Sequence, residues 1–221
     1  MKPYYEAYDD RYKTIHQLGL SWSSDIATPI VLQVADRYRP SQIFEIGCGE
    51  GRDARAVLDA GYRLLAADVS PEAIRYCKNA MPQYADCFIC MDCLCDNPDA
   101  EEKWYDMIYS VAVIHMLVSD GDRRRFYRFI HQHLTDGGMA LICTMGNGNN
   151  EMQTDINTAF TLQERDHLSG RVKVAATSCR MVSFRSFERE LAEGRFQIIE
   201  KGITESPPDF NSLMYAVVRP I

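Results

Sequence analysis

The sequence lacks long hydrophobic runs and an excess of positive charge. No apolar stretch approaches the roughly 18–20 residues of a membrane-spanning helix, and the first residues, Met1–Glu6, contain no apolar core of a signal peptide. The 221 residues carry 24 Lys and Arg against 31 Asp and Glu, a formal net charge of −7, which disfavours a nucleic-acid substrate because phosphate contacts need a basic face. We therefore expect a cytoplasmic protein with no membrane or nucleic-acid partner.

Internal repeats and low-complexity tracts are also absent, and the length suits a single domain over residues 1–221. We expect the 8 cysteines to be mostly reduced. Four of them crowd together at Cys87, Cys90, Cys93 and Cys95. Cys-x-x-Cys is a spacing of metal or metalloid ligands, but side chains three apart on a strand point to opposite faces. We predict no metal site, and the role of the cluster stays open.

The stretch Ile43–Asp53 combines the end of an apolar strand, a glycine turn and the start of a helix. Gly47, Gly49 and Gly51 stand at every second position, where they let the backbone turn tightly and approach a ligand without Cβ clashes. Such a strand, turn and helix is a cofactor cradle in many α/β proteins. A dinucleotide fingerprint requires its third glycine at the position that Arg52 occupies.

Glu45 stands at the end of the same strand, where its charge would repel a pyrophosphate. An acid in this place suits a ligand that carries an ammonium group instead. Together with Arg52, this acid disfavours an NAD(P)-dependent oxidoreductase, which we keep as the least favoured alternative.

Apolar strands and amphipathic helices alternate along the chain. Strands are expected near residues 42–46, 63–68, 87–91, 104–111, 139–144, 196–201 and 213–218. Helices are expected near residues 4–18, 26–38, 53–60, 120–134 and 183–191, and another begins after the cap residue Ser70. This alternation predicts an α/β fold with a parallel sheet and helices on both faces.

Two acids follow the second and third expected strands. Asp68 lies about 20 residues beyond Gly47, a spacing at which an acid at the next strand's end can accept hydrogen bonds from a ribose diol. Asp92 ends the third strand, and a Gly-Gly turn at residues 137–138 precedes the fifth. The order of the glycine turn, the two acids and the Gly-Gly turn along the chain is more specific than any one of these motifs.

Over about residues 42–145, this pattern resembles the class I, Rossmann-like S-adenosylmethionine (SAM)-dependent methyltransferases of the small-molecule type. The resemblance implies a doubly wound seven-stranded sheet, mostly parallel with the last strand antiparallel. It implies SAM as cofactor, S-adenosylhomocysteine (SAH) as product, and a cofactor site formed by Glu45, Gly47, Cys48, Gly49, Gly51, Asp68, Val69, Asp92, Cys93, Ser110 and Val111. In that site Asp92 and the N–H of Cys93 would hold the adenine, while Ser110 and Val111 would border the methionine end.

The expected reaction is an in-line SN2 transfer of a methyl group from SAM to a small-molecule acceptor. The acceptor, and whether its N, O or S atom is methylated, stays open. His115 follows the fourth strand and is a candidate general base, because an ordinary histidine titrates near neutral pH. The alternative for His115 is a histidine that caps a turn or packs beneath the substrate. A non-catalytic SAM- or SAH-binding protein is the other alternative function, and the protein is expected to be a monomer or a homodimer.

Two segments lie outside the alternating pattern. Residues 1–40 are expected to form N-terminal helices, with Tyr4, Tyr8 and Tyr12 on one face, either packed on the surface or closing the site as a lid. Residues 146–181 are expected to be an irregular polar insert that shapes the substrate pocket, with a surface elaboration or an oligomer contact as the alternative.

Overall fold

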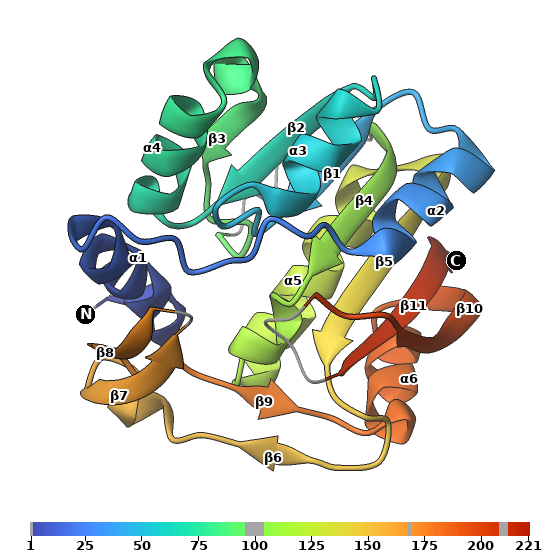
Figure 1. Ribbon diagram of the computed structural model, residues 1–221. Helices are drawn as coiled ribbons and strands as arrows, with labels where there is room; N and C mark the ends of the chain where they lie inside the picture. Colours follow the sequence, from blue (N-terminus) through green and yellow to red (C-terminus); the bar gives the residue numbers. More distant parts are fainter. Residues whose placement is uncertain (1, 96–103, 168, 208–211) are drawn as a thin grey trace.

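The computed structural model describes residues 2–95, 104–167, 169–207 and 212–221. At its centre is a seven-stranded sheet in the order β10-β11-β5-β4-β1-β2-β3 (Figure 1). The strands are β1 Ile43–Ile46, β2 Leu64–Asp68, β3 Phe88–Cys90, β4 Tyr105–Val111, β5 Leu134–Met145, β10 Phe196–Thr204 and β11 Leu213–Pro220. β11 runs antiparallel to both β5 and β10, whereas the pairs formed by β1 to β5 are parallel. The predicted Rossmann-like sheet, mostly parallel with the last strand antiparallel, is confirmed.

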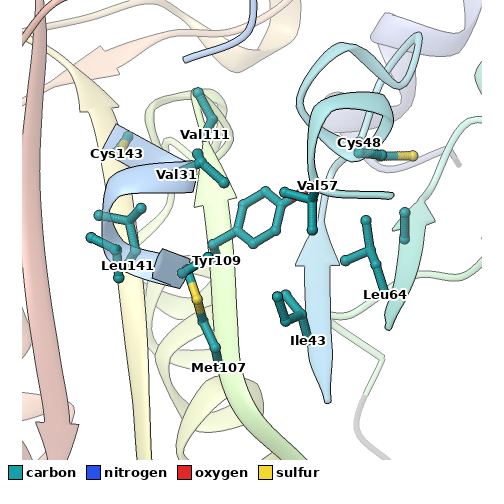
Figure 2. Packing of buried hydrophobic residues seen from close by; sticks show 14 of the residues in the cluster. Val31, Ile43, Cys48, Val57, Leu64, Met107, Tyr109, Val111, Leu141 and Cys143 are labelled. Carbon is teal, nitrogen blue, oxygen red and sulfur yellow. The ribbon is translucent and has the colours of Figure 1, made fainter. Parts of the chain in front are cut away.

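Helices cover both faces of the sheet because successive strand residues point to opposite sides. Ile43 of β1 packs in one core with helices α2 (Pro29–Tyr38), α3 (Arg52–Asp59) and α4 (Pro71–Ala80). Its neighbour Phe44 packs in the other core with α5 (Asp120–His133) and α6 (Phe184–Glu193). Figure 2 shows the first core, with Tyr109 of β4 among aliphatic side chains. The central strands are therefore buried on both faces, as parallel strands require.

Serine caps fix where three of these helices begin. Ser70 accepts a hydrogen bond from the N–H of Ala73 at 3.0 Å and is followed by Pro71 in the first turn of α4. Ser119 and Ser183 cap α5 and α6 in the same way. The cap predicted at Ser70 is confirmed.

The strand order reverses between β1 and β4. From β1 the chain continues outward to β2 and β3, whereas β4 and β5 extend the sheet in the other direction. In open α/β sheets, ligands bind beyond the carboxyl ends of the strands at such a switch point. The glycine turn after β1 and the segment after β4, which contains the 3₁₀ turn Ile114–Met116, meet at this place. The fold therefore indicates this place as the first candidate for a ligand-binding site.

Helix α1 (Ala7–Gln17), preceded by the 3₁₀ turn Tyr4–Glu6, packs against α4 and against a hairpin outside the central sheet. It contacts the hairpin of β7 (Leu162–His167) and β8 (Gly170–Ala175), which lies beside it in Figure 1. Ile15 of α1 packs with Val172 and Val174 of β8. The buried guanidinium of Arg11 donates to Ala175 O at 2.9 Å. The hairpin thus supports α1 from the side away from the sheet.

The expectation of an irregular segment over residues 146–181 was wrong in its middle part. Besides the hairpin, this segment contains the short antiparallel pair of β6 (Met152–Gln153) and β9 (Arg180–Met181), and the 3₁₀ turn Ile156–Thr158. A further 3₁₀ turn, Pro82–Cys87, leads into β3. None of the helices in the described ranges combines the length and apolar character that a membrane crossing requires.

Candidate active site

A cavity that opens to solvent lies at the carboxyl ends of β1 and β2, next to the end of β3 and beneath α1. Its walls combine tyrosines of the N-terminal segment, polar groups of the strand ends and apolar side chains that follow β4. The lining residues are Tyr5, Tyr8, Tyr12, Ile46, Gly47, Asp68, Val69, Met91, Asp92, Cys93, Leu94, Val113, Met116, Leu117 and Phe126. Five of the predicted cofactor residues are among them: Gly47, Asp68, Val69, Asp92 and Cys93.

The glycine turn borders this cavity at a point of close approach. Gly47 has a positive φ of +72°, and a Cβ added there would lie 2.3 Å from Cγ2 of Val113. Gly49 has a φ of +54°, and its added Cβ would lie 2.7 Å from the hydroxyl of Tyr12. Both positions therefore require glycine for conformation and for space.

Asp68 holds the glycine turn against the end of β2. Its Oδ2 accepts the N–H of Gly49 and its Oδ1 accepts the N–H of Ser70, both at 2.8 Å. Burial raises the pKa of Asp68, while the two N–H donors lower it. Each carboxylate oxygen can accept a further hydrogen bond, so this side chain can serve the turn and a ligand in the cavity together.

Asp92 connects the end of β3 with the N-terminal segment. Its Oδ1 accepts the N–H of Leu94 at 2.8 Å, and its Oδ2 accepts the hydroxyl of Tyr5 at 2.9 Å. Burial and then the charge of Asp92 raise the pKa of Tyr5, which keeps that hydroxyl protonated as a donor. The adjacent Cys93 thiol is buried in the cavity wall, and its burial raises its pKa.

Tyr5, Tyr8 and Tyr12 form the cover of the cavity, rather than the predicted face of Tyr4, Tyr8 and Tyr12. Tyr4 instead accepts hydrogen bonds from Val118 N and Ser119 N and donates to Asp122 at 2.7 Å. The difference arises because Tyr4–Glu6 is a 3₁₀ turn, which has 3.0 residues per turn instead of 3.6. The tyrosine that faces the cavity is shifted by one position as a result.

Glu45 lies below the glycine turn and does not face the cavity. It is 2% exposed, and its Oε2 has no hydrogen-bond partner among the described residues. Burial, and after it the charge of Asp53, raises the pKa of Glu45 well above its ordinary value. Asp53 itself accepts from Thr28 N at 2.6 Å and so anchors the start of α2.

The remaining predicted cofactor residues also lie outside the cavity lining. They are Cys48, Gly49, Gly51, Ser110 and Val111. Cys48 and Val111 pack in the core with α2 and α3, and Ser110 Oγ is buried without a hydrogen-bond partner in the described ranges. Gly49 and Gly51 shape the turn itself. These five residues pack behind the cavity wall.

His115 does not line the cavity. It is 3% exposed, in the 3₁₀ turn after β4, and its Nδ1 has no partner within the described part of the chain. Burial first, and then the charges of Arg123 and Arg11, lower the pKa of His115 to about 3. The imidazole is therefore neutral near pH 7 and a weak base. General-base catalysis by His115 stays a prediction that this arrangement does not favour.

Glu50, in the middle of the glycine turn, holds the N-terminal segment in place, a role that the sequence interpretation missed. Its Oε1 lies 2.8 Å from His16 Nε2 and accepts the N–H of Trp22 at 2.9 Å. Its Oε2 accepts from Ser21 Oγ and Ser23 N, both at 2.7 Å. Glu50 thus ties the end of α1 and the following loop to the turn. The indication of this role in the sequence was the position of an acid between two glycines.

The cysteine cluster is divided between surface and cavity. Cys90 and Cys95 are exposed, Cys87 is half-buried, and Cys93 faces the cavity. Among the described residues, no group of three or more His, Cys, Asp or Glu side chains is arranged to hold a metal ion.

The described residues fit an adenosine-containing cofactor. A buried carboxylate and a half-buried one at adjacent strand ends, a glycine turn without room for a Cβ and an apolar wall enclose one cavity. A search of curated protein sequences gives no match to the chain. A family profile described as "Methyltransferase domain" matches residues 44–140.

Solved structures match nearly the full chain. A 1,6-didemethyltoxoflavin-N1-methyltransferase of Burkholderia thailandensis, solved with its substrate and SAH, has a TM-score of 0.71 and 16% identity over 100% of this chain and 91% of that one. A SAM-dependent methyltransferase of Clostridium acetobutylicum has a TM-score of 0.64 and 13% identity over 98% of both chains. A TehB-like SAM-dependent methyltransferase of Corynebacterium glutamicum has a TM-score of 0.58 and 18% identity over 98% and 97%. The sequence resemblance is thereby confirmed: residues 44–140 match the methyltransferase domain family, and the whole chain has the fold of the SAM-dependent methyltransferases.

Proposed function

We propose that the protein transfers a methyl group from SAM to a small-molecule acceptor in the cavity beneath α1. The observation that carries this proposal is the pair Asp68 and Asp92, at the ends of adjacent strands, in the wall of one cavity that the glycine turn of Gly47 borders. Two carboxylates at the ends of adjacent strands suit a nucleoside whose ribose hydroxyls bind one carboxylate and whose base binds the other. The match to methyltransferase domains supports the same cofactor.

The chain's own residues would bind and orient the cofactor. Asp68 would accept the ribose hydroxyls, and Asp92 would accept the adenine amino group. Leu94, Leu117 and Phe126 supply an apolar wall for the adenine ring. SAM supplies a methyl group that its sulfonium already activates, so the protein's contribution is alignment of the acceptor with that methyl group and exclusion of water.

The rest of the cavity points to a small acceptor without a strong charge. Tyr8, Val113 and Met116 line it. Among the described residues no lysine or arginine lines the cavity, and its acids Asp68 and Asp92 have the roles given above. An acceptor atom that is nucleophilic without a protein base, such as an unprotonated nitrogen, suits this lining better than a hydroxyl group.

Calorimetry and turnover test the proposal. The protein should bind SAM and SAH but not NADH, and Asp68→Asn should weaken SAH binding. Transfer of isotope-labelled methyl groups from SAM to a panel of small thiols, amines and phenols should identify an acceptor. Binding of NADH in place of SAH would contradict the proposal. Tight SAH binding without turnover of any acceptor would favour the non-catalytic alternative.

His115→Gln tests the remaining role of the histidine in the same assay. Unchanged turnover from pH 6 to pH 9 would exclude His115 as the base. A loss of turnover with unchanged SAH affinity would support it, because a residue that merely packs beneath the wall would alter both.

A further inference from the structure

A second concave surface, the arginine groove, lies between α5 and α6. It is lined by the arginines Arg123, Arg124, Arg128, Arg180, Arg189 and Arg195. Its acids are Asp120, Glu190 and Glu193. The groove therefore carries an excess of positive charge on a chain whose formal net charge is −7. Such a local reversal of sign is an electrostatic signature of an anion-binding surface.

The floor of the arginine groove is neutralised by the protein itself. Arg123 is 2% exposed and forms a two-pronged ion pair with Glu190, at 2.9 Å from Nε and 2.6 Å from Nη2. Arg180 pairs with Asp120 at 2.5 Å. These pairs form the base of the groove, and Arg124, Arg189 and Arg195 contribute to the excess positive charge.

The guanidinium groups at the rim of the groove are available to bind a ligand. Arg124 of α5 and Arg195 after α6 are exposed, and in the described ranges neither side chain has an ion pair or a hydrogen bond. Arg189 has a long contact to Glu193, at 3.9 Å between two exposed side chains, which contributes little, and a hydrogen bond of 3.5 Å to Ser186 Oγ. His131 also lines the groove, and its buried Nε2 has no partner among the described residues. Donors from both helices thus surround one hollow.

The arginine groove is separate from the cofactor cavity. Arg123 Nη1 donates to Ile114 O at 2.6 Å and to Leu117 O at 3.1 Å, and Leu117 lines the cavity. The backbone after β4 therefore lies between the two sites. A ligand in the groove would not occupy the place of SAM.

We propose that the arginine groove binds a phosphate-bearing small molecule. A guanidinium group presents a planar fork of donors that matches phosphate oxygens. A tetrahedral phosphate accepts donors from several directions, whereas a planar carboxylate is satisfied by one or two arginines. Arg124 lies on α5, Arg189 on α6 and Arg195 just after α6, which is the arrangement that suits the tetrahedral group. A solvated helix face would instead spread its arginines over a convex surface.

Calorimetric titration of the full chain with pyrophosphate at low ionic strength tests this proposal. The double variant R124E/R195E should weaken binding at least tenfold, and so should added salt. The matched variant K78E/K173E makes the same charge change at exposed lysines of α4 and β8 and should bind pyrophosphate as the wild type does. SAH affinity should be unchanged in both variants, so failure here is distinguishable from failure of the proposed function.

Three results would overturn the proposal. The first is no heat of binding with the wild type, and the second is equal weakening in both double variants, which would indicate general electrostatics. The third is equal affinity for pyrophosphate and for a tricarboxylate of similar charge. Vesicles of anionic phospholipid distinguish the source of the phosphate: a free phosphate compound predicts no vesicle binding, and vesicle binding without pyrophosphate binding would refute the small-molecule ligand.

Discussion

His16 Nε2 lies 2.8 Å from Glu50 Oε1, which joins the cover of the cavity to the glycine turn. The other ring nitrogen, Nδ1, lies 2.6 Å from Glu72 Oε1 of α4. The His16 side chain is 6% exposed and stacks on Tyr76 with 4.6 Å between the ring centroids. Helix α1, which carries Tyr8 and Tyr12 into the cavity, is therefore fastened at one residue to two parts of the site.

Replacement of this histidine should loosen the cover. His16→Ala removes both carboxylate contacts, and hydrogen bonds to charged groups contribute about 1.5–3 kcal/mol each. If part of that free energy holds α1 in place for the ligand, SAH affinity should fall about tenfold, which corresponds to about 1.4 kcal/mol. Cleavage by trypsin within α1 should become faster. His133→Ala, which removes a hydrogen bond to Phe129 O and a ring contact with the Phe129 side chain, is the control, and equal SAH affinity in all three proteins would contradict the prediction.

Two glycine replacements separate backbone strain from loss of the site. Gly47→Ala places a Cβ 2.3 Å from Val113 Cγ2, whereas Gly61→Ala, at a φ of +87°, meets nothing within 4 Å. Both should lower the free energy of unfolding by about 1–2 kcal/mol for the left-handed backbone. Only Gly47→Ala should also weaken SAH binding, by more than tenfold, because Val113 must move. Urea unfolding and calorimetry measure the two effects, and retained SAH affinity in Gly47→Ala would refute the close approach.

Asp68→Asn should reduce cofactor affinity without unfolding the protein. The amide keeps one acceptor oxygen, so either the N–H of Gly49 or that of Ser70 loses its carboxylate partner. A charged acceptor for the ribose is lost as well, and SAH should bind at least tenfold more weakly. The control is Asp106→Asn, since Asp106 accepts from Ser41 N and Gln42 N before β1, at the opposite edge of the sheet. A larger loss of SAH affinity in the control than in Asp68→Asn would contradict the assignment.

The buried neutral His115 predicts a loss of stability in acid. Its pKa in the folded protein is about 3, below the ordinary 6.5, so the unfolded chain binds a proton that the folded chain does not. The resulting stability is complete above pH 6.5 and declines as the pH falls toward 3, by up to about 1.4 kcal/mol per pH unit. The free energy of unfolding, measured with urea, should fall between pH 7.5 and pH 5.5. This fall should be smaller by about 1 kcal/mol in His115→Gln than in the wild type. An equal difference in both proteins would mean that His115 titrates normally.

Local backbone requirements made much of the site predictable. The turn at Gly47 and the acids Asp68 and Asp92 are set by the ends of three neighbouring strands, and parallel strands bring such ends to one edge. The order of strands and helices was readable for the same reason: the central strands are mostly apolar, and each following helix begins at a cap or turn residue.

The cover and the walls depend on packing that sequence patterns do not contain. The exchange of Tyr4 for Tyr5 follows from one 3₁₀ turn, and a turn of three residues is too short to show its period in the sequence. The hairpin of β7 and β8 has an exposed first strand, so its only signal was the alternation of Val172 and Val174. Phe126 reaches the cavity from α5, far along the chain. Such contacts are set by tertiary structure and not by any local motif.

The position of β11 has a consequence for the order of folding. Within the described residues, β10 pairs in the sheet only with β11, and β11 pairs with β5, whose residue Ile142 faces Ala216. Pairing β11 with β5 closes the long stretch of chain between these two strands, which costs more entropy than joining β10 to β11 in a hairpin. We therefore expect β1 to β5 to assemble first and the hairpin to join as a unit. Until it does, β5 is an open apolar edge, and a folding intermediate is most prone to self-association there.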